Sequence, residues 1–391
     1  MPGRIKPWSI LPIYWQNCSS MTRYGMFLLT VLVGFTGGLL RAQDKAGLDD
    51  WLDRNVKEMG GRAFLVVSRD GKTVYSQSVN EMTRRQKMVN KFVAKRMGRE
   101  ANSDDYTMDT RLPVASCSKW FSAALVMTFV DDGRLSLDDT VGKYLPVMTE
   151  HGKGNITVRE CLSHLTGIKE PPLKQSLQHI RGLHSMDEAI DWIAGLPMEG
   201  EPGKVFHYSN AGLQIAAAVL EKISGKTFEV LFAERITRPL GMSHTDFGMG
   251  PVALAAGGAF STPTDYMKFL EMIAGGGASG GHRILSAGSV AEMQVNRITK
   301  DIRIAYSPAG NGADTGDTED TDGGSGMDNI GYGYGEWVFA DGAVSSPGLF
   351  GSVPIVDNKH HYCAFLMTFY LKNKGRVARL KELKGLLDRS L

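Results

Sequence analysis

Two short groups of residues in this chain have the types and the spacing of a serine nucleophile with basic partners. The first group is Ser116-Cys117-Ser118-Lys119, which follows small residues and leads into an apolar stretch typical of a helix. Residues three positions apart at a helix start lie on one face, so the Lys119 amine is expected beside the Ser116 hydroxyl. A serine hydroxyl attacks poorly until a base takes its proton, and a partly desolvated lysine is neutral often enough to take it. The free N–H groups and the positive dipole end of the helix start would stabilise the resulting oxyanion.

The second group is Tyr208-Ser209-Asn210, which opens another predicted helix. A tyrosine phenol normally loses its proton near pH ~10, but a neighbouring lysine ammonium favours the phenolate and makes it a general base. Asn210 could orient Lys119 or a substrate carbonyl. Each group says little by itself, because Ser-x-x-Lys occurs by chance and Ser-Asn is also an ordinary helix N-cap.

In combination the two groups resemble the class C serine β-lactamases and their relatives, the penicillin-binding D-alanyl carboxypeptidases, D-aminopeptidases and carboxylesterases. The resemblance covers most of the chain after residue 42, in the same order, and extends to five further segments. It implies that Ser116 is the nucleophile and that Lys119 and Tyr208 share the proton transfers, and we expect no metal or organic cofactor. The further segments are Leu137–Val141, Lys143–Pro146, Cys161–Gly167, Arg238–Met242 and Ala256–Thr262.

The third motif of the resembled family is Lys-Thr-Gly or His-x-Gly on a strand beside the site, and it falls here at Ser346-Pro347-Gly348. Ser346 offers a neutral hydroxyl where a Lys or His would help to hold a substrate carboxylate, and Pro347 lacks a backbone donor. If the alignment holds, the N–H groups of Ser116 and Leu349 form the oxyanion hole. A neutral ester then becomes a better candidate substrate than an anionic β-lactam or D-Ala-D-Ala end.

We therefore expect an exported serine hydrolase that forms an acyl-enzyme on Ser116 and acts on a small carboxylic ester, or on an amide. One alternative is a β-lactamase, a D-alanyl-D-alanine carboxypeptidase or a D-aminopeptidase, in which an arginine or lysine from elsewhere supplies the missing cation. A second alternative, from a different class, is a catalytically weak homologue that binds peptidoglycan fragments or a protein partner.

Other catalytic arrangements fit the sequence less well. Gly277–Gly281 has the Gly-x-Ser-x-Gly form of a hydrolase elbow, but it follows a predicted helix over 265–273, where an elbow needs a strand. The histidines lack a metal-binding spacing such as His-Glu-x-x-His, and the Asp-rich stretch 308–330 lacks a calcium-binding loop, so no metal site is expected. His164 and His207 lie beside motif residues and are expected to be structural neighbours.

The elements that must position these residues change from strand to helix and back along the chain. Ala63–Ser68 and Thr73–Ser76 flank Asp70-Gly71, which predicts a hairpin. We expect an α/β protein of the α+β type: a mainly antiparallel sheet built from both chain ends, flanked by helices, with an inserted all-helical lobe at about 120–250. By the resemblance this fold is β-lactamase/transpeptidase-like. Later strands are expected at 336–339, 349–356 and 361–370, and helices at 44–59, 120–130, 211–223, 228–236 and 376–387.

The composition of the chain indicates where the protein is located and which partners it is not expected to bind. The first 42 residues hold four basic residues and no acid, and the uncharged run Met26–Leu40 ends before Arg41, which together indicate a secretory signal peptide. Translation could instead start at Met21. The alternative to a signal peptide is a helix that is buried at the N-terminus of the folded protein. The expected product is a domain at 43–391, exported to the periplasm or secreted. This domain has 40 basic and 42 acidic residues, which argues against nucleic-acid binding by charge. Its cysteines, expected to be buried thiols, are Cys117, Cys161 and Cys363.

Two segments have the composition of surface insertions. Residues 84–99 carry seven basic residues and no acid, with apolar residues at roughly helical spacing. A solvated helix packed by one face is the simplest interpretation, and a lid or a membrane-surface contact is the alternative. Residues 308–330 have no apolar period and are expected to form a mobile loop.

Overall fold

The computed structural model describes residues 45–96, 101–180, 182–248, 250–308, 330–371 and 375–391. The expected signal peptide and almost all of the Asp-rich stretch 308–330 therefore lie outside the described residues, as do the last residues of the basic segment 84–99. No helix within the described residues combines the length and the apolar character needed to cross a bilayer.

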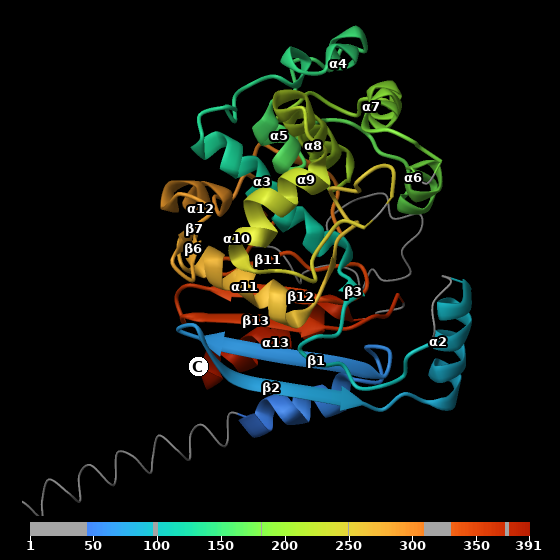
Figure 1. Cartoon of the computed structure of the whole chain (residues 1–391), viewed down its shortest axis with the longest axis vertical. Coiled ribbons are helices and arrows are strands. Elements are labelled where there is room, and N and C mark those ends of the chain that lie inside the picture. Colours follow the sequence, from blue (N-terminus) through green and yellow to red (C-terminus); the bar gives the residue numbers. More distant parts are fainter. Residues whose placement is uncertain (1–44, 97–100, 181, 249, 309–329, 372–374) are drawn as a thin grey trace, which may run out of the picture.

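A seven-stranded antiparallel sheet forms one layer of the molecule, with helices on both of its faces (Figure 1). Its strand order is β2-β1-β13-β12-β11-β10-β9, so strands from the two chain ends lie side by side, and β1 pairs with β13. The expected sheet built from both ends of the chain is confirmed. The strands are β1 (Arg62–Arg69), β2 (Lys72–Asn80), β9 (Gly331–Tyr332), β10 (Trp337–Val338), β11 (Val344–Ser345), β12 (Val353–Asp357) and β13 (Tyr362–Met367).

Most of the helices lie between β2 and β9 in the chain, and those from α3 to α9 form the upper part of the molecule in Figure 1. Three small two-stranded sheets join β3 (Leu112–Pro113) to β5 (Phe260–Ser261), β4 (Val205–His207) to β8 (Arg303–Tyr306), and β6 (Ala278–Ser279) to β7 (His282–Arg283). The helices are one over 45–55, α2 (Arg84–Arg96), α3 (Ser118–Asp131), α4 (Pro146–Glu150), α5 (Val158–Leu162), α6 (Leu173–Ile180), α7 (Met186–Gly195), α8 (Ala211–Ser224), α9 (Phe228–Phe232), α10 (Arg238–Leu240), α11 (Pro263–Ala274), α12 (Ala287–Met293) and α13 (Arg376–Ser390).

Alternation along the strands gives the sheet two apolar faces. Leu65 points to one face, where it packs in a cluster with Trp51 and with Leu383 of α13. Val66 points to the other face, where Phe365 and the helices α3, α8 and α11 form the main core. The sheet is therefore buried on both sides, and the N-terminal helix over 45–55 and α13 cover the face away from the helical lobe.

The expected hairpin at Asp70-Gly71 is confirmed. The β1–β2 hairpin turns at Asp70 and Gly71, which have φ values of 50° and 72°. A turn with two left-handed residues fits the twist of a two-stranded hairpin, which is why Asp-Gly marks it in sequence. Helix α8 ends at Gly225, whose φ is 70°.

Two boundaries differ from those expected. The strand predicted over 349–356 begins only at Val353, because Gly348 and Ser352 close a turn: Gly348 N–H donates to Ser352 O over 2.8 Å. The helix predicted to end before Pro239 instead continues from α9 through a π-helical turn into α10. Pro239 follows the π-helical turn inside this continuous stretch, so its missing N–H removes one helical hydrogen bond just before the helix ends at Leu240.

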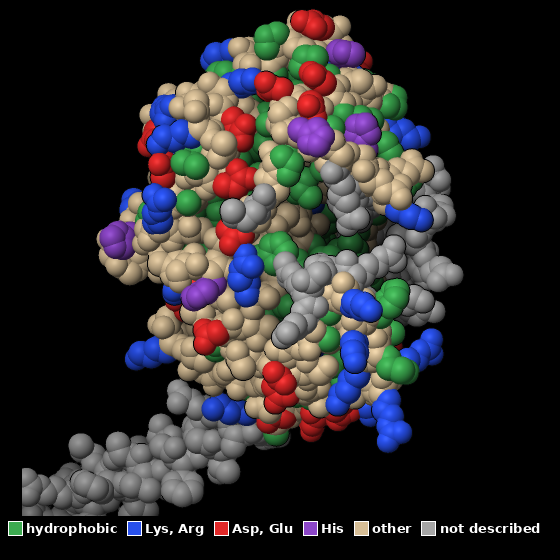
Figure 2. Space-filling model, turned by 45° about the vertical axis from the view of Figure 1, so that its right-hand side comes forward, with side chains coloured by type: hydrophobic (Ala, Val, Ile, Leu, Met, Phe, Trp, Pro, Cys, Tyr) green, Lys and Arg blue, Asp and Glu red, His purple; other side chains and the backbone are tan. Residues whose placement is uncertain are grey.

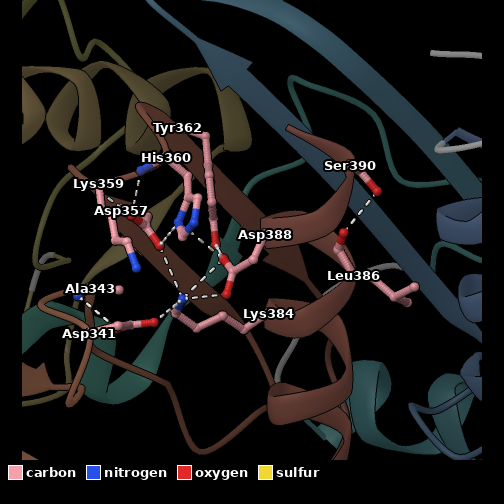
Figure 3. Close-up of polar contacts among 10 residues, drawn as sticks. All are labelled: Asp341, Ala343, Asp357, Lys359, His360, Tyr362, Lys384, Leu386, Asp388 and Ser390. Carbon is pink, nitrogen blue, oxygen red and sulfur yellow. Dashed lines mark hydrogen bonds and ion pairs between the residues drawn. The ribbon is translucent and has the colours of Figure 1, made fainter. Parts of the chain in front are cut away.

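A buried lysine fastens α13 to the sheet (Figure 3). Lys384 Nζ lies 2.6 Å from an Asp341 oxygen, 3.0 Å from Asp357 and 2.9 Å from Asp388. Burial alone would raise the pKa of Asp357, but hydrogen bonds from His360 and Lys384 outweigh it and lower the pKa to about 2. Because Asp341 lies between β10 and β11 and Asp357 ends β12, one ammonium joins the helix to separate parts of the sheet.

Glu336 is a buried carboxyl group without a partner among the described residues. It directly precedes β10, it is 0% exposed, and neither of its side-chain oxygens has a hydrogen-bond partner. Burial raises the pKa of Glu336 well above its usual value. Burial therefore favours the protonated, uncharged form of the Glu336 side chain.

We expect Glu336→Met to raise the free energy of unfolding by about 1–3 kcal/mol near pH 8, because it removes a buried polar group that has no partner. The folded pKa lies above the unfolded pKa, so the native chain loses stability as pH rises from the unfolded pKa towards the folded one. Urea unfolding at pH 5 and at pH 8 measures the free energy of unfolding of both chains. The difference between the variant and the native chain should be larger at pH 8. Glu201→Met, at an exposed glutamate, is the control. An advantage of equal size at both pH values would contradict the neutral state of Glu336.

Candidate active site

The serine of the first motif lies on a short strained turn that leads into α3. Ser116 is the middle residue of a 3₁₀ turn, Ala115–Cys117, and Ala115 has a φ of 48°. This left-handed conformation costs a non-glycine residue roughly 1–2 kcal/mol. Two side chains hold the turn in place: Ser118 Oγ donates to Ala115 O over 2.6 Å, and Tyr266 OH donates to Cys117 O over 2.9 Å.

Lys119 is fully buried, and its ammonium meets three oxygen acceptors. Nζ lies 3.2 Å from Ser116 Oγ, 3.2 Å from Asn210 Oδ1 and 2.8 Å from Ala256 O. An ammonium has three donors, so this set occupies all of them. Burial lowers the pKa of Lys119 to about 7, and the negative charge of Glu170 opposes that effect. Near neutral pH, Lys119 is therefore an amine in a large fraction of molecules and can accept the Ser116 proton.

Tyr208 approaches the same serine from the segment just before α8. Its ring stacks on Trp337, with centroids 5.5 Å apart, and Lys119 Nζ lies 4.8 Å from the ring centroid. Burial raises the pKa of the Tyr208 phenol, and its hydrogen bond with Ser116 offsets only part of the rise. The phenolate expected from the sequence is thus disfavoured in the free protein, because desolvation outweighs the neighbouring positive charge. As a neutral phenol Tyr208 can pass a proton, while Lys119 titrates near neutral pH.

Glu170 is a site residue that no motif in the sequence indicates. Its Oε2 accepts the N–H groups of Asn210 and Ala211 over 2.6 and 3.2 Å, and its Oε1 accepts from Asn210 Nδ2 over 3.3 Å. The carboxylate therefore caps the start of α8 and fixes the Asn210 amide, so that Oδ1 faces Lys119. Glu170 is 8% exposed and lies in a loop 40 residues before Asn210, in no motif.

Ser346 lies beside the nucleophile, but its hydroxyl is turned into the protein. Ser346 is 2% exposed, and its Oγ is 2.9 Å from Gly335 O and 3.2 Å from Ser116 O, so the hydroxyl donates to backbone carbonyls. The position that would carry a Lys or His in the resembled family thus supports the nucleophile turn and carries no charge.

Gly348 and Leu349 follow in a turn. A Cβ on Gly348 would lie 2.2 Å from Val114 O, so only glycine fits against the chain that leads to Ser116. Because the Gly348 N–H already bonds to Ser352 O, it is not available as an oxyanion donor. The N–H groups of Ser116 and Leu349 stay the expected pair.

Arg376, the first residue of α13, brings a positive charge towards the same region. Its Nη2 donates to Leu349 O over 2.6 Å. The charge also acts on the pKa values of Cys117 and Tyr208, where it lowers the pKa in each case but is a smaller cause than burial. The sequence predicts a helix over 376–387, but nothing local indicates that this helix begins near Ser116.

The two histidines near the motifs are structural neighbours, as expected. His164 Nε2 lies 3.0 Å from Tyr332 OH, and the His164 ring packs 4.5 Å from the Tyr208 ring, centroid to centroid. Burial lowers the pKa of His164 well below its usual value, so the ring is neutral. His207 pairs with Glu199 through Nδ1.

The remaining candidates from the sequence lie outside this arrangement. Ser279 is in β6, which follows α11 and turns into β7, so it is not on a strand-to-helix elbow. Cys117, Cys161 and Cys363 are buried free thiols, as expected. The group of possible metal ligands found among the described residues is Asp357, His360 and Asp388, and its carboxylates already bind Lys384.

Known proteins are similar to this chain in sequence. A family model described as Beta-lactamase matches residues 48–387. The chain is 26% identical over 198 residues to the D-alanyl-D-alanine-carboxypeptidase/endopeptidase AmpH of Escherichia coli (strain K12). This match covers 44% of the chain and 51% of AmpH, so the chain spans about half the length of that relative.

Solved structures share the fold. A protein from Bacteroides dorei DSM 17855, described as a candidate beta-lactamase, matches with a TM-score of 0.67 at 26% identity, over 88% of this chain and 98% of that one. A family VIII carboxylesterase matches with a TM-score of 0.64 at 17% identity, over 88% and 97% of the two chains. The second likeness concerns the fold alone. Together they confirm the expected β-lactamase/transpeptidase-like fold.

We expect Glu170→Gln to shift the pH dependence of Ser116 reactivity to lower pH. The Glu170 charge raises the pKa of Lys119, so its removal lowers that pKa and leaves more neutral amine at a given acidic pH. The rate of covalent labelling by a fluorophosphonate, measured from pH 5 to 9, reports the midpoint. The rate at the plateau should fall by about tenfold or less, because the amide keeps one acceptor oxygen.

Glu221→Gln is the matched control, since Glu221 also accepts a helix-capping N–H, from Phe228 over 2.7 Å, at the far end of α8. A plateau loss without a shifted midpoint would show that Glu170 acts only on the structure of the loop.

Proposed function

This chain belongs to the beta-lactamase family, and from that premise we propose that it is a serine hydrolase that forms an acyl-enzyme on Ser116. The observation that carries the proposal is the position of Lys119, fully buried with its Nζ 3.2 Å from Ser116 Oγ and its pKa lowered to about 7. A base with a pKa near the working pH is the most effective kind for this proton transfer.

In the proposed reaction the neutral Lys119 amine takes the proton from Ser116 Oγ as this oxygen attacks the substrate carbonyl carbon. The oxyanion of the tetrahedral intermediate accepts from the N–H groups of Ser116 and Leu349. The intermediate collapses to the acyl-enzyme, and the leaving oxygen or nitrogen takes a proton that Lys119 supplies through Tyr208 OH. Water then attacks the acyl carbon and gives one proton to the same pair. When the bond from the acyl carbon to Ser116 Oγ breaks, the pair passes this proton to Oγ, which releases the acid and the free serine.

Carboxylic esters are the proposed substrates. Ser346 is neutral and its hydroxyl is committed to two backbone carbonyls, so the third-motif position offers nothing to a substrate carboxylate. Compared with a site that has a Lys or His at this position, an anionic substrate lacks one charged hydrogen bond here. A neutral ester would not form that bond in either site, so its binding is not weakened. The solved carboxylesterase with this fold has the same general architecture.

A D-alanyl carboxypeptidase or β-lactamase activity is the second candidate, and Arg376 is the observation that favours it. Its guanidinium bonds to Leu349 O, next to the expected oxyanion donors, and could hold a carboxylate in place of a third-motif lysine. The similarity to AmpH, named as a D-alanyl-D-alanine-carboxypeptidase/endopeptidase, supports the same candidate.

Export to the periplasm or the cell exterior is part of the proposal. It is supported by the basic, acid-free first 42 residues and the uncharged run Met26–Leu40. N-terminal sequencing of protein recovered outside the cytoplasm tests it, since a processed chain should begin near residue 43.

We expect Ser116→Ala to abolish covalent labelling by a fluorophosphonate and to lower turnover of p-nitrophenyl esters by at least roughly 10⁴-fold, because only the nucleophile is removed. The thermal unfolding temperature should stay close to that of the native chain. Ser279→Ala, at the serine of the Gly-x-Ser-x-Gly segment, is the matched control and should label normally. Labelling that survives in Ser116→Ala and disappears in Ser279→Ala would overturn the assignment. No labelling of the native chain would favour a non-catalytic binding protein.

The native chain should hydrolyse short neutral esters with a much higher kcat/KM than nitrocefin or a D-Ala-D-Ala peptide. Ser346→Lys should raise the ratio of anionic to neutral kcat/KM by roughly 10- to 100-fold, the value of one charged hydrogen bond. Because Ser346 is buried, Arg376→Gln is the second variant, and it should leave the ester rate within a few-fold of native. If the native chain prefers the anionic substrates and Arg376→Gln removes this preference, the carboxypeptidase or β-lactamase candidate replaces the esterase.

A further inference from the structure

The basic helix α2 carries its large apolar side chains on the outside of the molecule. Met88 is 66% exposed, Val89 is 53% exposed and Phe92 is 64% exposed. Successive residues of an α-helix are about 100° apart, so these three side chains form one strip that is about 100° wide. In Figure 1, α2 lies at the edge of the molecule beside the sheet, away from the helical lobe.

The described side chains of α2 that bond to the body of the protein are polar. Gln86 Nε2 donates to Lys57 O over 3.3 Å, and Asn90 Nδ2 donates to Asn102 O over 2.8 Å. A pocket of about 430 Å³, partly lined by Asn90 and Ala94, lies between the helix and the body. A helix packed by one face was expected. Among the side chains described, those that hold α2 to the body are polar, and the apolar Met88, Val89 and Phe92 lie outside.

Positive charges accompany the strip. Arg84, Lys91 and Lys95 border it on the side of Met88 by helical spacing, and Lys87 comes next beyond them. Arg85 lies within the strip, and all five are exposed. No ion pair between described residues uses a Lys or Arg of α2, and Arg84–Arg96 contains no acid. Figure 2 shows Lys and Arg side chains with hydrophobic ones between them on this part of the surface.

We propose that this outer face of α2 docks the protein onto the surface of a bilayer that contains anionic lipid. An interfacial helix places its apolar strip at the boundary of headgroups and acyl chains, and its flanking cations contact lipid phosphates. The exposed strip of Met88, Val89 and Phe92 meets the first requirement, and the acid-free cationic border meets the second. Nucleic acid would use the cations but leave the apolar strip in water, so lipid matches the whole face better. This docking does not depend on the proposed hydrolysis.

Co-sedimentation of the full chain with vesicles tests the proposal. Vesicles of phosphatidylcholine alone are compared with vesicles that contain about 30% phosphatidylglycerol, at low and high salt. The native chain should bind the anionic vesicles and lose binding in high salt. The triple variant Lys87→Gln, Lys91→Gln, Lys95→Gln should bind about 100-fold more weakly, since one cation near the surface is worth about fivefold. Met88→Gln with Phe92→Gln should weaken binding at least about tenfold.

Matched controls alter the same residue types elsewhere. Val230 and Val295 are 42% and 44% exposed, and Val230→Gln with Val295→Gln should bind as the native chain does. Lys72→Gln, Lys359→Gln and Lys381→Gln together remove as many exposed lysines as the α2 variant. The N-terminal apolar run Met26–Leu40 is identical in every variant, so it cannot produce a difference between them.

Three outcomes would overturn the proposal: no binding of the native chain to anionic vesicles, equal binding to neutral vesicles, or α2 variants that bind like the native chain. Size-exclusion chromatography tests whether a second copy of the chain covers the strip instead. If the native chain does not bind vesicles but forms a dimer, and the Met88→Gln, Phe92→Gln variant is a monomer, the strip is a dimer interface. Unchanged thermal unfolding of the variants shows that α2 substitutions leave the fold intact, whether or not the chain hydrolyses esters.

Discussion

The burial of a single ammonium group, that of Lys119, is the constraint around which the candidate site is organised. A buried lysine is tolerable only if acceptors replace the water that it loses, and here they come from three separate parts of the chain: Ser116, Asn210 and Ala256. The same burial that makes the group costly brings its pKa to about 7, which gives it a use as a base. The surroundings of Lys119 therefore determine both the free-energy cost of burying the ammonium and its ability to act as a base.

The fold holds these parts together through long-range contacts. The 3₁₀ turn before α3 carries Ser116, and the first turn of α3 carries Lys119. Glu170 fixes the start of α8, and the segments of β10 and β11 place Trp337 against Tyr208 and Ser346 against the nucleophile turn. At the other end of the sheet, Lys384 binds carboxylates from two segments and fixes α13 (Figure 3). Because α13 is fixed, Arg376 at its start has a defined position beside Leu349.

The features that could be predicted from the sequence depend on local spacing. Those that could not be predicted depend on burial and on contacts between distant parts of the chain. Ser116 and Lys119 come together because three residues make nearly one helical turn, and Asp70-Gly71 sets a hairpin by its own backbone preferences. The protonation of Tyr208 could not be foreseen, because desolvation decides it and burial is a property of the whole fold. Glu170 and Arg376 reach the site from loops and helices far away in the chain, with no motif to mark them. The polar inner side of α2 was hidden for the same reason, since composition does not show which face of a helix meets the protein.

The pairing of β1 with β13 sets the order in which this molecule can assemble. Val66 lies opposite Phe365, about 300 positions away in the sequence, in the middle of the sheet. Contacts between such distant positions close large loops and make folding slow. The hairpin β1–β2 is made first but has no neighbour on its inner edge until the last strand and α13 exist. The central sheet is therefore completed only after Tyr362–Met367 has been synthesised and has paired with a strand made almost at the start of the described chain.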